Sequence, residues 1–215
     1  MRKQMQKKSK ILQLIKDNLK ENLKEYLIVS LIFIIGIIVG TIFINHSTEE
    51  QQIEIQKHLI GFIERLNTDS KIDMTVLLQS SIINNLLLAL ILWFIGSTVI
   101  GIPLVCLIIG IQGFLLGYTI SATLITYSGF KGILFTMICL LAQNIFFIPC
   151  IIAIAVSGIK LYKSIIKDKR KENIKMEILR HTIFLFIISI CLIASSFVET
   201  YISGNMIMIS RKIFC

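Results

Sequence analysis

Few side chains in this 215-residue chain have the type and spacing that chemistry would need. Three histidines and five cysteines are present, but their spacing forms no HExxH pair and no Cys-x-x-Cys. The chain also contains no Gly-x-Ser-x-Gly elbow and no Gly-Lys-Ser/Thr phosphate loop. We therefore nominate no catalytic, cofactor-binding or metal-binding residue and expect a protein that is not an enzyme.

The remaining candidates are polar residues inside long apolar stretches, where they are costly and usually face the interior of a helix bundle. These residues are Asn84, Asn85, Gln112, Gln143, Asn144 and Glu199. The amides are more simply interpreted as interhelical hydrogen-bonding groups than as a transport path. Glu199 is the single acid in any expected span. It could pair with an amide such as Gln143, line a cavity that opens outward, or reach the membrane interface.

Three residues without polar side chains complete the candidates for structural or interaction roles. Pro149 predicts a kink, because proline removes one backbone hydrogen bond and clashes with the preceding turn. Gly113 and Gly117 lie in a glycine-rich stretch of the third expected span, and Gly36 and Gly40 have small-xxx-small spacing in the first. Such spacing lets another helix approach closely.

The elements that must position these residues are membrane-spanning helices. Between Met74 and Ile159 the only charged side chain is Lys131, and hydrophobic residues make up 55% of the chain. A helix needs about 20 apolar residues to cross the bilayer, and the runs lack the alternation of a β-barrel. The sequence therefore predicts an all-α, polytopic membrane protein with a five-span domain over residues 26–203. The expected spans are residues 26–44, 76–95, 104–126, 133–154 and 182–203.

The basic residues predict how the chain is oriented. Sixteen of the 22 lysines and arginines lie in residues 1–25 and 155–181, whereas the loop 45–75 carries six acids and three bases. The positive-inside rule places the two basic segments in the cytoplasm and the loop 45–75 outside, together with the tail 204–215. The orientation is N-in and C-out. This distribution explains the net charge of +9 without a nucleic-acid partner.

Two segments outside the spans are expected to form amphipathic helices. Residues 1–25 fit either a helix on the anionic inner leaflet, with membrane lipid as its partner, or a solvated topology signal. In the outer loop, Ser47 and Glu50 have the spacing of a capping box, and an apolar stripe follows at helical spacing. The stripe consists of Ile55, Leu59, Phe62, Ile63 and Leu66. It could bind a partner or pack over the outer end of the bundle.

A series of short motifs, in this order, resembles the stage II sporulation protein M family across nearly the whole chain. The series contains Asn84-Asn85, Gly101-Ile102-Pro103, Gly113-Phe114-Leu115-Leu116-Gly117-Tyr118-Thr119, Gly129-Phe130-Lys131-Gly132, Gln143-Asn144-Ile145-Phe146-Phe147-Ile148-Pro149 and the Glu199 to Tyr201 end of the last span. Two departures are visible. Ala142 stands where the family often has proline, and Gln112 stands where a basic residue is expected.

The resemblance implies a non-enzymatic scaffold of the engulfment complex in endospore-forming bacteria, located in the mother-cell membrane at the sporulation septum. It implies two partners, the stage II sporulation proteins D and P, which are membrane-anchored peptidoglycan hydrolases that act in septal wall thinning and membrane migration. A homo-oligomer is compatible with it. The alternative is a small transporter or channel that uses Glu199 and the buried amides. The short chain and the lack of a recognisable inverted repeat count against that alternative.

Overall fold

The computed structural model of this chain describes residues 22–68, 74–98, 100–126, 133, 136–137, 142–167 and 174–203. Within these ranges the elements are helices, so the all-α prediction is confirmed. They are α2 (Leu23–Asn45), α3 (Glu49–Thr68), α4 (Met74–Gly96), α5 (Gly101–Thr126), α7 (Ala142–Lys167), α8 (Ile174–Val198) and a π-helical turn (Glu199–Ser203) that continues α8. The expected N-terminal amphipathic helix falls mainly on residues 1–21, which lie outside the described residues, as does the tail 204–215.

Five of these helices are long and apolar enough to cross a membrane, which confirms the five-span prediction. The candidate spans are Leu23–Asn45, Met74–Gly96, Gly101–Thr126, Asn144–Ile166 and Lys175–Tyr201. The fourth and fifth helices correct the expected bounds. The fourth was expected at 133–154, but α7 begins at Ala142 and continues to Lys167. Lysines near a helix end can extend their aliphatic stems toward the interface, so Lys160 and Lys163 do not terminate the helix.

The consequence is that residues 155–181, expected as a cytoplasmic loop, contain the end of α7 and the start of α8. The connection between these two helices is therefore much shorter than the basic segment that marks it. Pro149 lies inside α7, and the helix continues on both sides of it. Its missing N–H removes one backbone hydrogen bond there, and the expected kink remains a prediction.

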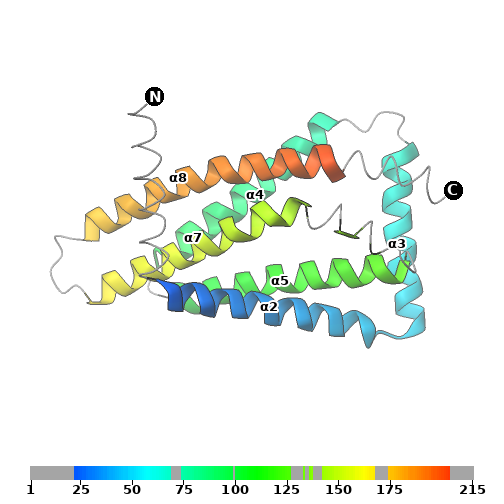
Figure 1. The fold of residues 1–215 in the computed structure, drawn as a ribbon, viewed down its shortest axis with the longest axis horizontal. Coiled ribbons are helices and arrows are strands. Elements are labelled where there is room, and N and C mark those ends of the chain that lie inside the picture. The colour runs from blue at the N-terminus through cyan, green and yellow to red at the C-terminus, as the bar shows by residue number, and fades with distance from the viewer. Residues whose placement is uncertain are drawn as a thin grey trace, which may run out of the picture.

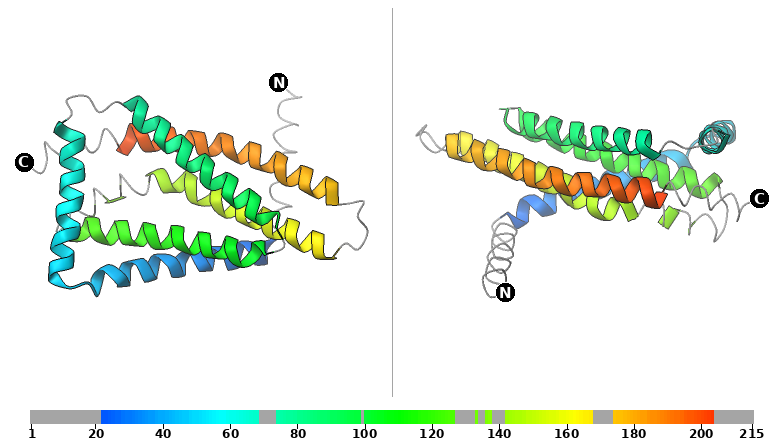
Figure 2. Two further views of the ribbon diagram at one scale, coloured as in Figure 1. Left: turned by 180° about the vertical axis from the view of Figure 1, so that it is seen from behind. Right: turned by 90° about the horizontal axis from the view of Figure 1, so that it is seen from above.

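The spanning helices lie side by side, and α3 lies across one end of the bundle (Figures 1 and 2). A short turn joins α4 to α5, and the two helices diverge from it toward the end that α3 crosses (Figure 2). Residues such as Val29, Leu92, Ile109, Ile151 and Leu192 are buried between the helices. The large exposed side chains of α2 and α8 are mostly apolar, as expected of surfaces that face hydrocarbon.

Glycines allow α2 and α5 to pack backbone against backbone. A Cβ atom added at Gly36 or Gly40 of α2 would overlap a backbone carbonyl oxygen of α5. A Cβ atom at Gly113 or Gly117 of α5 would overlap a carbonyl oxygen of α2 in the same way. The two small-residue patterns therefore face each other. Interhelical approach this close is the arrangement that small-xxx-small spacing favours in membranes.

Candidate functional site

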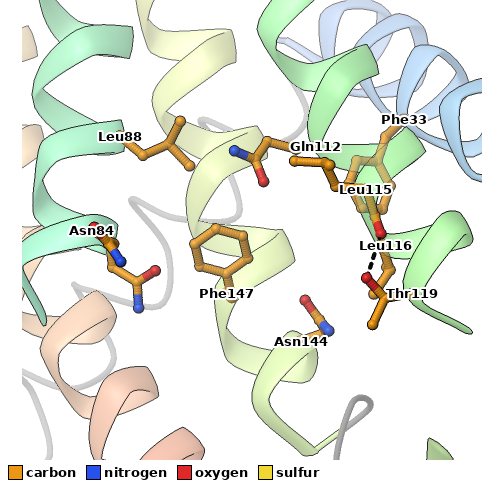
Figure 3. A pocket seen from close by; sticks show the side chains of 10 residues that line it. Phe33, Asn84, Leu88, Gln112, Leu115, Leu116, Thr119, Asn144 and Phe147 are labelled. Atoms are coloured by element: carbon orange, nitrogen blue, oxygen red, sulfur yellow. Dashed lines mark hydrogen bonds between the residues drawn. The ribbon is translucent and has the colours of Figure 1, made fainter. Parts of the chain in front are cut away.

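Amide side chains from three helices meet at one cavity inside the bundle (Figure 3). This amide-lined cavity has a volume of about 290 Å³ and carries Asn84 and Asn85 from α4, Gln112 from α5 and Asn144 from α7. None of the described side chains that line it is charged. The rest of the lining is Phe33, Leu88, Leu115, Leu116, Thr119 and Phe147. A cavity of this volume has room for roughly ten water molecules or for one polar side chain with some water.

The structure thus gathers four of the residues selected from the sequence, namely Asn84, Asn85, Gln112 and Asn144. Asn85 and Asn144 are buried, Gln112 is half-buried and Asn84 is exposed at the edge of the cavity. The Gln112 amide points from α5 toward Leu88 of α4 (Figure 3). The side chain of Gln143 lies outside the described part of the chain, so a pairing of Gln143 with Glu199 stays a prediction.

Asn85 connects the cavity to a hydroxyl network between α4 and α8. Its Nδ2 donates to Ser196 Oγ over 2.9 Å and lies 3.5 Å from Ser81 Oγ. The Ser81 hydroxyl donates in turn to the Glu199 carboxylate, and Ser196 Oγ donates to the Leu192 carbonyl over 3.1 Å. A described partner of Glu199 is therefore a serine of α4. Sequence reasoning missed both serines, because serine in a helix often bonds only to its own backbone.

A second polar cluster lies where α4, α7 and α8 cross. The His181 Nδ1 atom is 2.7 Å from Ser157 Oγ, and the imidazole stacks nearly parallel to the Trp93 ring, with centroids 6.5 Å apart. Only 3% of His181 is exposed. Beside the ring, a Cβ atom at Gly96 would lie 2.8 Å from the Gly158 Cα. Because the Ser–His pair is enclosed, it serves as a packing contact between helices rather than as a site that a substrate could reach.

Polar side chains cap the start of α3. At its start the Thr48 N–H donates to Gln51 Oε1 over 3.1 Å, and the Gln51 N–H donates to Thr48 Oγ1 over 3.4 Å. This reciprocal capping box corrects the expected pair by one position, since the Ser47 hydroxyl instead donates to the Phe43 carbonyl over 2.9 Å.

Two glutamines one turn apart on α3 then bind the ends of two spans. Gln52 Nε2 donates to the Ile44 carbonyl of α2 over 3.4 Å, and Gln56 Nε2 donates to the Ile125 carbonyl of α5 over 3.3 Å. The last four carbonyls of a helix have no partner within the helix, and the Ile125 carbonyl receives one from Gln56. The Ile44 carbonyl also accepts from the Ser47 N–H over 3.1 Å, so Gln52 adds a second donor there. Of the predicted apolar stripe, Ile55 is half-buried. The side chains of Leu59, Phe62, Ile63 and Leu66 lie outside the described part.

At the opposite end of the bundle, α2 and α7 are joined by an ion pair. Lys163 Nζ lies 2.6 Å from Glu25 Oε1, and Glu25 is the less exposed of the two. Among the described residues, no three His, Cys, Asp or Glu side chains are placed so that they could hold a metal ion. The interactions that the described part offers are hydrogen bonds of amides, hydroxyls and the Glu199 carboxylate within the bundle and an ion pair at its end.

Comparison with known proteins adds one result. The family described as stage II sporulation protein M matches residues 29–204, which is most of the chain and includes all five candidate spans in whole or in large part. No curated protein and no solved structure matches the chain.

Proposed function

The chain belongs to the stage II sporulation protein M family, and we propose that it is a non-enzymatic membrane scaffold of the sporulation engulfment complex. It localises and organises peptidoglycan hydrolases, the stage II sporulation proteins D and P, for septal wall thinning and membrane migration. Its place is the mother-cell membrane at the sporulation septum. Family membership and five apolar helices make it a sporulation membrane protein, and the scaffold role is the proposed step beyond that.

The observation that carries the proposal is the fixed position of α3 across the end of the bundle (Figure 1). Bonds from Gln52 and Gln56 tie this helix to the ends of α2 and α5. Its first turns expose Glu49, Glu50 and Glu54 to the surroundings. Binding to a preformed helix costs less conformational entropy than binding to a flexible loop, because the helix is already ordered. The positive-inside rule places this helix on the side where the wall is cut.

The proposal is tested by co-purifying the two full-length hydrolases with the chain from crosslinked membranes. In the test variant a glycine–serine linker of equal length replaces residues 49–66. We expect the hydrolases to be lost from this variant while its amount in the membrane stays unchanged. The control is Gly61→Ala on the same helix, because a Cβ atom there meets no atom within 4 Å. Full hydrolase yield with the linker variant would remove α3 from the role.

The amide-lined cavity is the observation that favours the alternative, a small transporter or channel. Neutral amides in a 290 Å³ cavity could hydrogen-bond an uncharged polar solute during transport. The two functions separate in proteoliposomes that contain this protein alone. Solute flux that Asn84→Leu abolishes would support a permease. Absent flux, with hydrolases retained in pull-downs, would support the scaffold.

A further inference from the structure

We propose that the amide-lined cavity is an intramembrane docking site for the transmembrane helix of a partner, which inserts an amide or hydroxyl side chain. This site presupposes the proposed scaffold function and adds to it a contact within the bilayer, separate from α3. The cavity is too small for a helix, so the partner helix lies along α4 and α5 and only one polar side chain enters.

The amides of the cavity differ in their hydrogen bonding. Asn85 bonds to Ser196, whereas in the described part of the chain Asn84 and Gln112 form no hydrogen bond, although both face the cavity. Asn84 lies near the middle of α4 and Gln112 near the middle of α5, so both are close to the centre of the bilayer. Polar groups at that depth need a partner, because hydrocarbon supplies none.

The surfaces of α4 and α5 beside the cavity indicate the direction from which a partner can approach. Beside the cavity, α4 exposes Ile83 and Leu87, which are 53% and 54% accessible, and α5 exposes Ile111 and Leu115, which are 48% and 49% accessible. Both stripes are apolar and belong to spans, so their surroundings are lipid or another membrane helix. The helices α4 and α5 diverge from their common turn (Figure 2), and the amide-lined cavity lies between them. A partner therefore approaches within the membrane plane.

The lining of the cavity determines which chemical group can be inserted. A primary amide both donates and accepts hydrogen bonds, and the described side chains that line the cavity carry no charge. The complementary group is therefore neutral and also both donates and accepts, as the side chains of asparagine, glutamine, serine and threonine do. Leu88, Leu115 and Phe147 beside the amides match the apolar flank of the same helix. Interhelical bonds of this kind are common between membrane helices.

Photo-crosslinking in membranes that hold the full chain and one full-length hydrolase tests the docking site. A benzophenone amino acid replaces Leu87 or Leu115 beside the cavity, or Ile35 or Ile38 on the exposed face of α2 as a control. We expect adducts from the first pair that map to the transmembrane segment of the hydrolase, and none from the second. The double variant Asn84→Leu/Gln112→Leu is expected to lower adduct yield about 3- to 30-fold. Ser80→Leu, an exposed position of α4 outside the lining, is the matched control.

Each other outcome counts against the docking site. Adducts with lipid alone, or with a second copy of this chain, would overturn it, and so would unchanged yield in the double variant. If the hydrolase co-purifies while the cavity positions give no adduct, the docking site is wrong and the scaffold function stands. If the hydrolase fails to co-purify with the unaltered chain, both are wrong.

Discussion

Gln56 of α3 donates a hydrogen bond to the carbonyl oxygen of Ile125, in the last turn of α5, over 3.3 Å. The two residues are distant in sequence, and the bond joins the helix that crosses the bundle to a helix that spans it. Gln52, one turn earlier, makes the equivalent bond to the end of α2 over 3.4 Å. The same face of α3 therefore contacts the ends of two spans, and hydrogen bonds to their terminal carbonyls help to position α3.

Replacing Gln52 and Gln56 by leucine is expected to release α3 from the bundle. A neutral hydrogen bond contributes about 0.5–1.5 kcal/mol, so the pair should lower the local opening free energy of α3 by about 1–3 kcal/mol. Hydrogen exchange in nanodiscs measures this, as faster exchange in α3 with unchanged exchange in α4. Glu54→Gln, an exposed change on the same helix, is the control. Equal protection of α3 in all three proteins would mean that its apolar contacts alone fix it.

Alanine at Gly113 or Gly117 is expected to separate α2 from α5, because the added methyl group would overlap backbone atoms that cannot rotate away. Overpacking typically costs about 1–3 kcal/mol, and a lower melting temperature in detergent should report it. Gly110→Ala on the same helix is the matched control, since its Cβ atom would meet only Ile32 Cγ2, at 3.7 Å. A Gly110 variant as unstable as the other two would show that glycine matters there for another reason.

The apolar runs predicted the number of spans because the bilayer imposes a length on every crossing helix. Their ends were harder to place. Lys160 and Lys163 suggested a loop, yet α7 continues through both, because charge at a helix end is tolerated where the side chain reaches the interface. The sequence also misplaced the capping box by one residue. Ser47 and Thr48 both suit the role, and only the geometry shows that Thr48 takes it.

The candidate site was predictable in its residue types and not in its pairings. Asn84, Asn85 and Asn144 stood out as amides in apolar surroundings, and they line one cavity. The bond from Asn85 to Ser196 joins residues whose helices meet only after folding, and no local pattern encodes it. Helix pairing in a membrane depends on surface shape, which spacing reveals only for glycine patterns.

Reversing the charge at Glu25 is expected to weaken the contact between α2 and α7. An ion pair this exposed contributes about 0.3–1 kcal/mol and is screened by salt. Glu25→Lys should therefore lower the melting temperature slightly at low ionic strength, and the double variant Glu25→Lys/Lys163→Glu should restore it. Double-mutant cycles at low and at high salt measure the coupling. Coupling that persists at high salt would contradict a solvent-screened pair.

The N-in orientation predicts which cysteines an impermeant reagent can reach. With the native cysteines replaced, a cysteine at Glu54 on exposed α3 should react from outside intact cells, and one at Lys175 near the start of α8 should react only after lysis. Both side chains are accessible, so burial does not decide the result. The reverse pattern would invert the topology and place α3 in the cytoplasm, away from the wall.

Glu199→Gln is expected to weaken complex assembly more than membrane insertion. The glutamine retains an acceptor for the Ser81 hydroxyl, so the contact between α4 and the end of α8 should survive, while the carboxyl group is lost. Ser81→Ala breaks the same bond from the other side and leaves the carboxylate in place. Interhelical bonds in membranes contribute about 0.6–1.7 kcal/mol, so Ser81→Ala should mainly lower the melting temperature. Hydrolase co-purification and thermal unfolding, measured on both variants, separate the two roles. If Glu199→Gln lowers stability as Ser81→Ala does and leaves hydrolase yield unchanged, Glu199 is a packing residue. If only the yield falls, the carboxyl group of Glu199 serves assembly.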